Sequence, residues 1–256
     1  MRILVLGWVL AAGVMLHSQA ALDQRPLPDT DAFYEAVRQN MVRADREQNR
    51  YAYKERRTDI HTNPFGRIGT GGTRVIEVIP AADGLTASRR VIERDNVPVS
   101  DSPAEKITLS QRRGQNSSRN VEDITQTLTF AIARREMVDG RPFIVIDFEP
   151  RPGAKPSTRQ GRLARAFKGS MWVNEDAHEI ERVEATAVQD LSFGLGLVAR
   201  LRKGATVSAE RKPVEGGLWM PTSVRLNGAG RAILFRKLDI DYALDWFDYR
   251  LVVPAR

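Results

Sequence analysis

The sequence predicts a mainly β protein of the α+β class, with an antiparallel sheet of about nine to eleven strands and one N-terminal helix. Three features indicate this fold. The stretch 167–188 contains a strand, a polar turn and a second strand, and such a hairpin needs a larger sheet to be stable in water. From residue 191 onward, strand-like runs recur about every ten residues between glycine turns. The stretch 29–48 has apolar residues at helical spacing instead.

The composition allows a packed core and excludes several kinds of site. The chain has 256 residues, of which 42% are hydrophobic, and a formal net charge of +7 at pH 7. It contains no cysteine, so neither disulfides nor thiolate metal sites can form. Stability must therefore come from the burial of apolar surface.

Residues 1–20 predict a secretory signal peptide. A basic start at Arg2 precedes the apolar run 3–16 and Ser18-Gln19-Ala20, a small-x-small pattern. The run is short for a membrane span, and an uncleaved anchor is the alternative. We expect export with cleavage after Ala20, which disfavours nucleic acid as a partner. Because no cysteine follows the cleavage site, the chain cannot be a lipid-anchored bacterial lipoprotein.

Residues 21–50 are predicted to form an N-terminal helix region, followed by a single β domain over 51–256. The helix spans about 29–48 and is capped by Asp29, Thr30 or Asp31. Its apolar residues follow a narrow stripe: Phe33, Ala36, Val37, Met41 and Ala44. A helix with one narrow apolar stripe is expected to pack on a sheet with its other side in water.

The first part of the β domain is predicted to contain three strands. These are 51–60, 73–80 and 85–94, and the last two join through an Asp-Gly turn. The intervening segment 61–73 is rich in glycine and is predicted to be a loop. Its glycines lack the spacing and the lysine of a phosphate-binding loop.

Residues 96–123 interrupt the strand pattern and are predicted to be an insertion. Pro98, Pro103 and a polar run break the periodicity, and a short helix is expected at about 104–113. Such an insertion is either a lid or a disordered segment, and the sequence leaves both possibilities open.

Strands are expected again at 125–138 and 143–148. The second is a continuous apolar run, which predicts a central strand buried on both faces. A basic loop at 151–168 follows, with six basic residues and no acidic one. The basic residues are Arg151, Lys155, Arg159, Arg162, Arg165 and Lys168. They form either a docking surface for an anionic lipid or an acidic partner, or a solvated loop.

The hairpin 167–188 leads into the predicted strands 191–201, 206–213, 218–227 and 233–245. In its second arm, Val183, Ala185 and Ala187 share one face, opposite to Ile180 and Arg182. Turns are expected at 203–204, 215–217 and 227–230, which contain glycine. Glycines within 191–201 suggest that the sheet curls there, while a short helix at 195–202 is the alternative.

The chain has no recognisable catalytic motif. His61 and His178 are expected to be surface turn residues, because neither belongs to an HExxH sequence. No GxSxG or SxxK motif is present. Asp239 and Asp241 share a strand face that could bind a hard cation, although such alternation is far more often the solvated side of a strand.

Without a catalytic motif, the remaining candidate for a functional site is an apolar binding surface. A curved sheet with a helix against it encloses either a filled core or an apolar cavity. The residues predicted to line such a cavity are large and apolar: Phe130, Trp172, Phe193, Leu195, Leu197, Trp219 and Phe235.

Several segments resemble the outer-membrane lipoprotein-sorting (LolA/LolB-like) superfamily of periplasmic carriers. They are Phe143–Lys155 (FIVIDFEPRPGAK), Gly169–Asn174, Ile180–Glu184 and Gly217–Pro221. The resemblance covers about residues 125–250. It implies a curved, unclosed antiparallel half-barrel, covered by the N-terminal helix and a short lid helix, with an apolar cavity for acyl chains.

The resemblance therefore predicts a periplasmic, non-catalytic protein that holds acyl chains of a lipoprotein or a lipid. It implies no cofactor and no metal, a monomeric state, and an inner- or outer-membrane protein as a further partner. The alternatives are an envelope sensor or scaffold domain that binds a protein partner, and an exported hydrolase.

Overall fold

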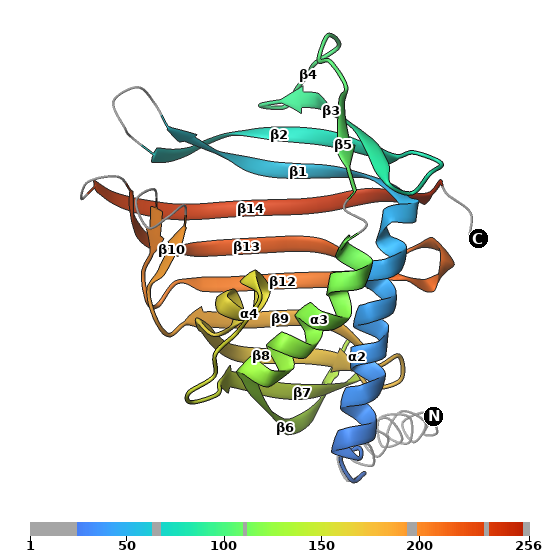
Figure 1. The fold of residues 1–256 in the computed structure, drawn as a ribbon, viewed down its shortest axis with the longest axis vertical. Coiled ribbons are helices and arrows are strands. Elements are labelled where there is room, and N and C mark those ends of the chain that lie inside the picture. The colour runs from blue at the N-terminus through green and yellow to red at the C-terminus, as the bar shows by residue number, and fades with distance from the viewer. Residues whose placement is uncertain (1–24, 63–67, 110–111, 194–198, 233–235, 253–256) are drawn as a thin grey trace, which may run out of the picture.

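The computed structural model describes residues 25–62, 68–109, 112–193, 199–232 and 236–252 (Figure 1). The predicted signal peptide, residues 1–20, lies outside this part of the chain. Within it, the protein is mainly β: a single antiparallel sheet carries the helices on one side.

The sheet comprises 14 strands within the described residues. The first seven are β1 (Tyr51–Thr62), β2 (Ile68–Pro80), β3 (Thr86–Arg94), β4 (Val97–Pro98), β5 (Glu105–Thr108), β6 (Leu128–Val138) and β7 (Arg141–Pro150). The others are β8 (Phe167–Asn174), β9 (Glu179–Ala187), β10 (Leu191–Phe193), β11 (Ala199–Leu201), β12 (Thr206–Pro213), β13 (Trp219–Ala232) and β14 (Arg236–Leu251).

The strand order is β4-β3-β2-β1-β14-β13-β12-β9-β8-β7-β6, with β5, β10 and β11 beside this path. The ends of the path, β4 and β6, do not pair with each other within the described chain, so the sheet is unclosed. This main path confirms the predicted antiparallel, unclosed sheet of about nine to eleven strands.

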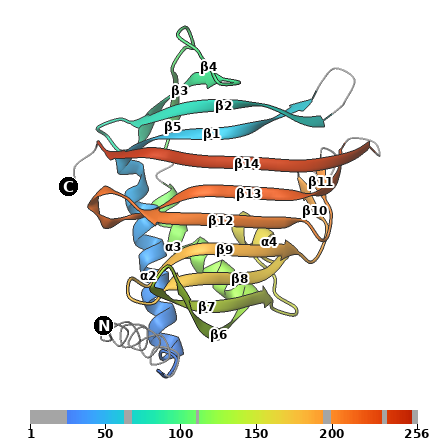
Figure 2. The same ribbon diagram turned by 180° about the vertical axis from the view of Figure 1, so that it is seen from behind.

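Three helices lie on the same side of the sheet, as the front and rear views show (Figures 1 and 2). They are α2 (Thr30–Glu47), which continues into the 3-10 turn η1 (Gln48–Arg50), α3 (Arg112–Thr127) and α4 (Arg159–Ala164). The Asp29 side chain accepts a hydrogen bond from the Ala32 backbone N–H at 2.9 Å, so Asp29 is the N-cap of α2. We call the helix-bearing side of the sheet the inner face.

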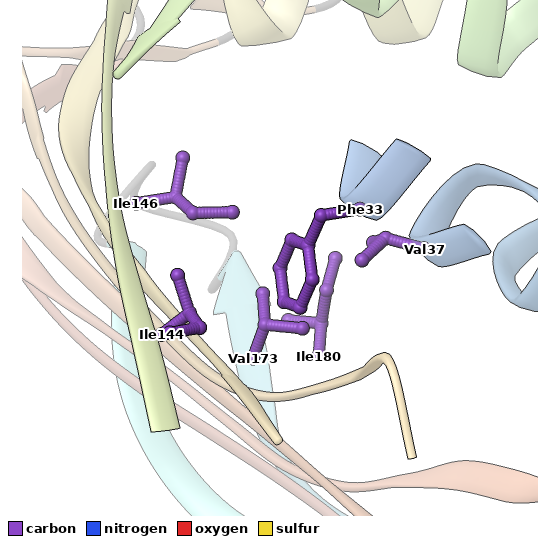
Figure 3. Packing of buried hydrophobic residues seen from close by; sticks show 6 residues of the cluster. All are labelled: Phe33, Val37, Ile144, Ile146, Val173 and Ile180. Atoms are coloured by element: carbon purple, nitrogen blue, oxygen red, sulfur yellow. The ribbon is translucent and has the colours of Figure 1, made fainter. Parts of the chain in front are cut away.

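The best-buried core lies between α2 and strands β7 to β9. Phe33 and Val37 of α2 pack against Ile144, Ile146, Val173 and Ile180 (Figure 3). Ile144 and Val173 have no exposed surface. Burying side chains of this size contributes about 1.5–3 kcal/mol each, so this contact is the main attachment of α2 to the sheet.

Strand β7 is buried on both faces, as its continuous apolar run predicts. Ile144 and Ile146 face α2, whereas Phe143 and Val145 pack with Trp172 on the opposite face. The prediction that this strand is central is wrong, because β7 is next to the last strand of the path. On the outer face of β7, aromatic and arginine side chains take the place of a second layer of secondary structure. Arg141 is one of them, and its guanidinium lies 5.3 Å from the Phe143 ring.

The segment after β3 differs from the prediction. Residues 105–108 form strand β5 rather than a helix, and the helix of this region is α3, which begins at Arg112. Strand β6 begins at Leu128, so the first residues of the strand predicted from 125 belong to the helix. The apolar residues Val121 and Ile124 of α3 pack against α2, α4 and the sheet, and this tertiary packing decides the conformation of an otherwise polar segment.

The structure also differs from the prediction in three glycine-containing segments. Residues 191–201 were predicted as one strand, with a short helix at 195–202 as the alternative. Instead, Leu191 pairs with Leu201, so β10 and β11 are two antiparallel strands. Gly228 lies inside β13 rather than in a turn. A Cβ atom there would lie 2.5 Å from the Cβ of Ala205, so glycine allows a close contact. Strand β2 begins at Ile68, inside the predicted loop 61–73.

Candidate ligand cavity

A row of apolar residues crosses the inner face of the sheet. Its members lie directly opposite one another on adjacent strands, and directly opposed residues of antiparallel strands share a face. The row, which we call the inner row, contains Ile146, Met171, Val183, Ala209, Val224 and Leu244. Because Ile146 packs with Phe33 of α2, the whole row faces the helices.

A second row of directly opposed residues runs beside it. It contains Phe148, Gly169, Ala185, Val207, Leu226 and Tyr242. Val207 packs near Ile124 of α3 and Ala164 of α4, and Leu226 packs near Leu163 of α4. The two rows give the inner face a continuous apolar surface from β7 to β14.

The burial of this surface changes along the rows. Ile146 on β7 is 1% exposed, whereas Val224 and Leu244 on β13 and β14 are only partly buried. Neither Val224 nor Leu244 belongs to a buried cluster of the described residues. The inner face is therefore packed beneath the helices at β7 to β9 and accessible at β13 and β14.

A cavity of about 480 Å³ lies between α2, α3 and the sheet. Its lining is mostly apolar: Asp31, Tyr34, Glu35, Val37, Arg38, Met41, Val121, Ile124, Thr125, Phe130, Arg151, Met171 and Ile180. This volume is within the range of about 300–1,000 Å³ that is typical of small-molecule sites. Met171 belongs to the inner row, so the cavity is continuous with the apolar surface of the sheet.

Six of the 13 lining residues carry polar groups: Asp31, Tyr34, Glu35, Arg38, Thr125 and Arg151. The Tyr34 ring lies 6.2 Å from the Phe130 ring in an edge-on arrangement. The Tyr34 hydroxyl is buried without a hydrogen-bond partner among the described residues, and burial raises its pKa. Arg38 donates to both oxygens of Glu35, at 2.7 and 2.6 Å. Hydrogen bonds from Arg38 and Gln39 lower the pKa of Glu35 to about 2, so this pair is ionised and mutually satisfied at neutral pH.

Helix α2 is held at its middle by the turn between β8 and β9. The Asn40 side-chain amide donates to the carbonyl oxygens of Ala177 and His178, at 2.9 and 3.1 Å. Nearby, Glu179 is 2% exposed and forms ion pairs with Arg43 at 3.5 Å and Arg211 at 3.2 Å. Burial raises the pKa of Glu179, and the two guanidinium groups oppose this change. These contacts fix the α2 wall of the cavity.

Helix α3 is held by the segment that begins α4. Asp123 accepts hydrogen bonds from the backbone N–H groups of Ser157 and Thr158, both at 2.9 Å, and from their hydroxyl groups at 3.2 and 2.6 Å. Burial alone would raise the pKa of Asp123, but these hydrogen bonds outweigh it and lower the pKa to about 2. Helix α3, the second helix that lines the cavity, is thus attached to the start of α4 through the Asp123 carboxylate.

Among the predicted lining residues whose side chains the structure describes, only Phe130 lines this cavity. Trp172 faces the opposite side of the sheet, where the Arg182 guanidinium lies 3.9 Å from its ring. Trp219 is buried outside the cavity, and its neighbour Met220 is the residue that packs with Ala44 of α2. Leu195, Leu197 and Phe235 lie outside the described residues, as does the side chain of Phe193.

The six basic residues predicted for docking are all exposed. Arg159 and Arg162 lie on α4, so the predicted loop contains a short helix. Arg151 also lines the cavity and donates to the Leu128 carbonyl oxygen at 3.2 Å. The basic segment therefore begins at the mouth of the cavity.

The other chemical candidates are dispersed. His178 is in a turn, with its ring 5.2 Å from that of Phe33, and the side chain of His61 is outside the described residues. Two further acidic residues near the C-terminus, Asp245 and Asp248, pair with Arg225 and Lys54 at 2.6 and 2.8 Å. Asp241 is exposed, and the side chain of Asp239 lies outside the described residues. The described residues contain no group of three or more acidic or histidine side chains placed to hold a metal ion.

Most of the lining was missed because it comes from the helices. Met41 belongs to the predicted stripe of α2 and Tyr34 lies beside that stripe, whereas Val121 and Ile124 belong to α3, which was not predicted as a helix. A second apolar edge on α2, with Tyr34 next to the stripe, is the signal that could have located the cavity.

Comparison with solved structures gives similar folds at low identity. A LolA superfamily protein from Nitrosomonas europaea matches with 15% identity and a TM-score of 0.35, covering 85% of this chain and 92% of that one. The superfamily predicted from the sequence is thus among those that this fold resembles. A DUF1329 family protein from Desulfovibrio piger matches with 15% identity and a TM-score of 0.36, covering 87% and 94%.

The lipoprotein LppX from Mycobacterium tuberculosis matches with 13% identity and a TM-score of 0.28, covering 89% of this chain and 99% of that one. Similarity at these levels concerns the fold alone and carries no argument about ligands or partners. No protein-family model matches the sequence, and no curated protein matches it. Among the helices in the described part of the chain, none is long and apolar enough to cross a membrane.

Proposed function

We propose that this protein is an exported, non-catalytic carrier that holds an acyl chain of a lipid or a lipoprotein on the inner face of its sheet. The observation that carries the proposal is the apolar cavity of about 480 Å³, whose lining residue Met171 belongs to the inner row that leads across the sheet to the partly exposed Val224 and Leu244. Burial of an acyl chain contributes about 0.8 kcal/mol per CH₂ group, so a chain of ordinary length supplies ample affinity without polar contacts.

The basic segment 151–168 completes the proposal as a docking surface. Its six basic side chains are exposed and begin at the cavity mouth with Arg151. An anionic membrane surface or an acidic membrane protein would place the cargo beside the cavity at the point of transfer. The predicted signal peptide would direct the protein to the periplasm, where both surfaces are available.

Two measurements test the carrier function. Protein purified from the periplasm is expected to yield acyl lipid on solvent extraction and mass spectrometry. The delipidated protein is expected to enhance the fluorescence of N-phenyl-1-naphthylamine, a neutral apolar probe, and fatty acid is expected to displace the probe. Absence of both extracted lipid and probe binding would overturn the proposal.

A matched pair of variants locates the site. Leu244→Glu puts a charge on the inner row, whereas Ala243→Glu puts the same charge on the opposite face of the same strand. Leu244→Glu is expected to weaken probe binding at least tenfold, because an unpaired carboxylate would have to be desolvated by the ligand. Ala243→Glu is expected to leave binding unchanged; equal effects of the two substitutions would contradict the assignment of the inner face.

A further inference from the structure

Five of the six polar residues that line the cavity are either paired or exposed. Glu35 and Arg38 bond to each other, and the Thr125 hydroxyl donates to a backbone carbonyl oxygen of its own helix at 2.7 Å. Asp31 and Arg151 are exposed, so water can satisfy their charged groups. These five side chains therefore need no ligand to complete their hydrogen bonds.

Tyr34 differs from these five residues. Its hydroxyl group is buried and has no hydrogen-bond partner among the described residues. Its ring lies edge-on to the Phe130 ring of β6, 6.2 Å away, at the sheet side of the cavity. A buried polar group without a partner destabilises the folded protein, and a ligand that supplies the missing partner gains that free energy on binding.

The fold holds Tyr34 in a defined place. The residue before it, Phe33, packs in the core beneath α2, and Asn40 ties the middle of the same helix to the turn between β8 and β9 (Figure 3). Burial raises the pKa of the Tyr34 phenol, so the group stays protonated at neutral pH and can donate a hydrogen bond.

The surroundings of Tyr34 favour an uncharged acceptor. The cavity lining carries two acidic and two basic side chains, which leave no net charge: Asp31, Glu35, Arg38 and Arg151. An ionised carboxylate would lose its hydration in the cavity, and one phenol does not replace that hydration. The carbonyl oxygen of an ester costs much less to bury and accepts a single O–H donor.

We propose that the Tyr34 hydroxyl donates a hydrogen bond to the ester carbonyl oxygen of an acyl chain bound in the cavity. The inference rests on the carrier function and adds the class of ligand to it: esterified acyl chains in preference to free fatty acids. Because the hydroxyl is buried in the structure, a rotation of the Tyr34 side chain toward the cavity accompanies binding.

The test compares two ligands with the same chain. Methyl dodecanoate and dodecanoate are titrated against N-phenyl-1-naphthylamine bound to the wild-type protein and to Tyr34→Phe. The substitution is expected to weaken methyl dodecanoate about fivefold, which corresponds to one net hydrogen bond. It is expected to leave the affinities of dodecanoate and of the probe unchanged. A loss confined to dodecanoate, or an equal loss for all three ligands, would overturn the proposal.

Infrared spectroscopy gives a second readout that a change of cavity shape would not imitate. Methyl dodecanoate with an isotope label at its carbonyl carbon is bound to both proteins, and its C=O stretching band is measured. Hydrogen bonding lowers the frequency of this band, so the band is expected at a higher frequency in Tyr34→Phe than in the wild-type protein. The same frequency in both proteins would count against the bond.

Tyr51→Phe is a matched control outside the cavity. The Tyr51 hydroxyl donates to the Glu215 carbonyl oxygen at 2.7 Å, so its removal is expected to lower the midpoint of thermal unfolding and to change no ligand affinity. Tyr34→Phe is expected to do the reverse, because it removes a hydroxyl that has no partner. If Tyr34→Phe lowers the midpoint of the ligand-free protein as much as Tyr51→Phe does, the hydroxyl serves the fold and the proposal is wrong.

The outcomes separate this inference from the carrier function. If the wild-type protein binds neither the probe nor either ligand, the carrier function fails and this inference fails with it. If all three bind and Tyr34→Phe does not weaken the ester selectively, the ester site is overturned while the apolar carrier stands.

Discussion

Ile144 on β7 and Leu244 on β14 both belong to the inner face of one sheet, but their surroundings differ. Ile144 has no exposed surface and packs beneath Phe33 and Val37 of α2. Leu244 is partly exposed and packs in none of the buried clusters of the described residues. We call the region of β7 to β9 the covered half and the region of β12 to β14 the open half.

The difference indicates how one sheet serves two purposes. In the covered half, helix side chains fill the space above the strands, so the apolar residues there stabilise the fold. In the open half, the inner-row residues Val224 and Leu244 remain in contact with solvent, where they contribute little to folding and are available to a ligand. Substitutions in the covered half should therefore mainly change stability, and those in the open half should mainly change binding.

The largest expected effect is at the centre of the covered half. Ile144→Ala is expected to lower the free energy of unfolding by about 4 kcal/mol, because it removes buried methyl groups and leaves a cavity that α2 cannot collapse to fill. Denaturant unfolding followed by circular dichroism measures the change. A loss below about 1 kcal/mol would show that the contact with α2 is loose and that the two halves do not differ in packing.

The next effect concerns the buried carboxylate beneath α2. Glu179→Ala is expected to cost about 3 kcal/mol, because it leaves the partly buried Arg211 guanidinium without its counter-charge. Arg43→Ala removes the exposed partner of the same carboxylate and is expected to cost less than about 1 kcal/mol. Equal losses from the two substitutions would contradict the assignment of Arg211 as the principal partner.

The covered half is also where sequence patterns predicted the structure well. Apolar spacing located α2 and the buried strand β7, because each pattern is local and reflects burial by the rest of the fold. Asp29, the N-cap of α2, was one of three predicted candidates. The second arm of the central hairpin was predicted less well. Ile180 faces α2 together with Val183, although simple alternation places them on opposite faces. A register shift between β8 and β9 changes the side-chain direction there, and alternation alone cannot reveal it.

The elements that were missed depend on contacts between distant segments. Helix α3 has few apolar residues and takes its position from Asp123, which bonds to residues 34 and 35 positions later in the chain. Gly228 suggests a turn in the sequence, but in the structure it makes room for Ala205. The sequence likewise predicted an apolar cavity but not most of its lining residues. The lining depends on how α2 and α3 pack on the sheet, and local sequence patterns do not contain that information.

A smaller effect is expected where α3 is attached to α4. Asp123→Ala is expected to lower the free energy of unfolding by about 2 kcal/mol at pH 7, because it removes hydrogen bonds to a charged group. Since the folded pKa of Asp123 is about 2, below its ordinary value, its contribution is present above about pH 4 and is lost as the pH falls toward 2. Unfolding of both proteins at pH 7 and pH 3 measures the difference, which should shrink at pH 3. A difference that grows at low pH would contradict the lowered pKa.

The smallest effect on folding is expected in the open half, at Leu244. Leu244→Ala is expected to cost less than about 1 kcal/mol in the absence of ligand, because the side chain is already partly exposed in the folded protein. In the presence of ligand, the stabilisation gained on binding should depend on Leu244 and not on Ile144. At 100 times its dissociation constant, a ligand stabilises the wild-type protein by about 2.7 kcal/mol, and Leu244→Ala should lose part of that gain while Ile144→Ala retains it. Thermal unfolding of each variant with and without dodecanoate measures both quantities. If Leu244→Ala destabilises the ligand-free protein as much as Ile144→Ala does, the open half is packed in solution, and the inner row is a core rather than a binding surface.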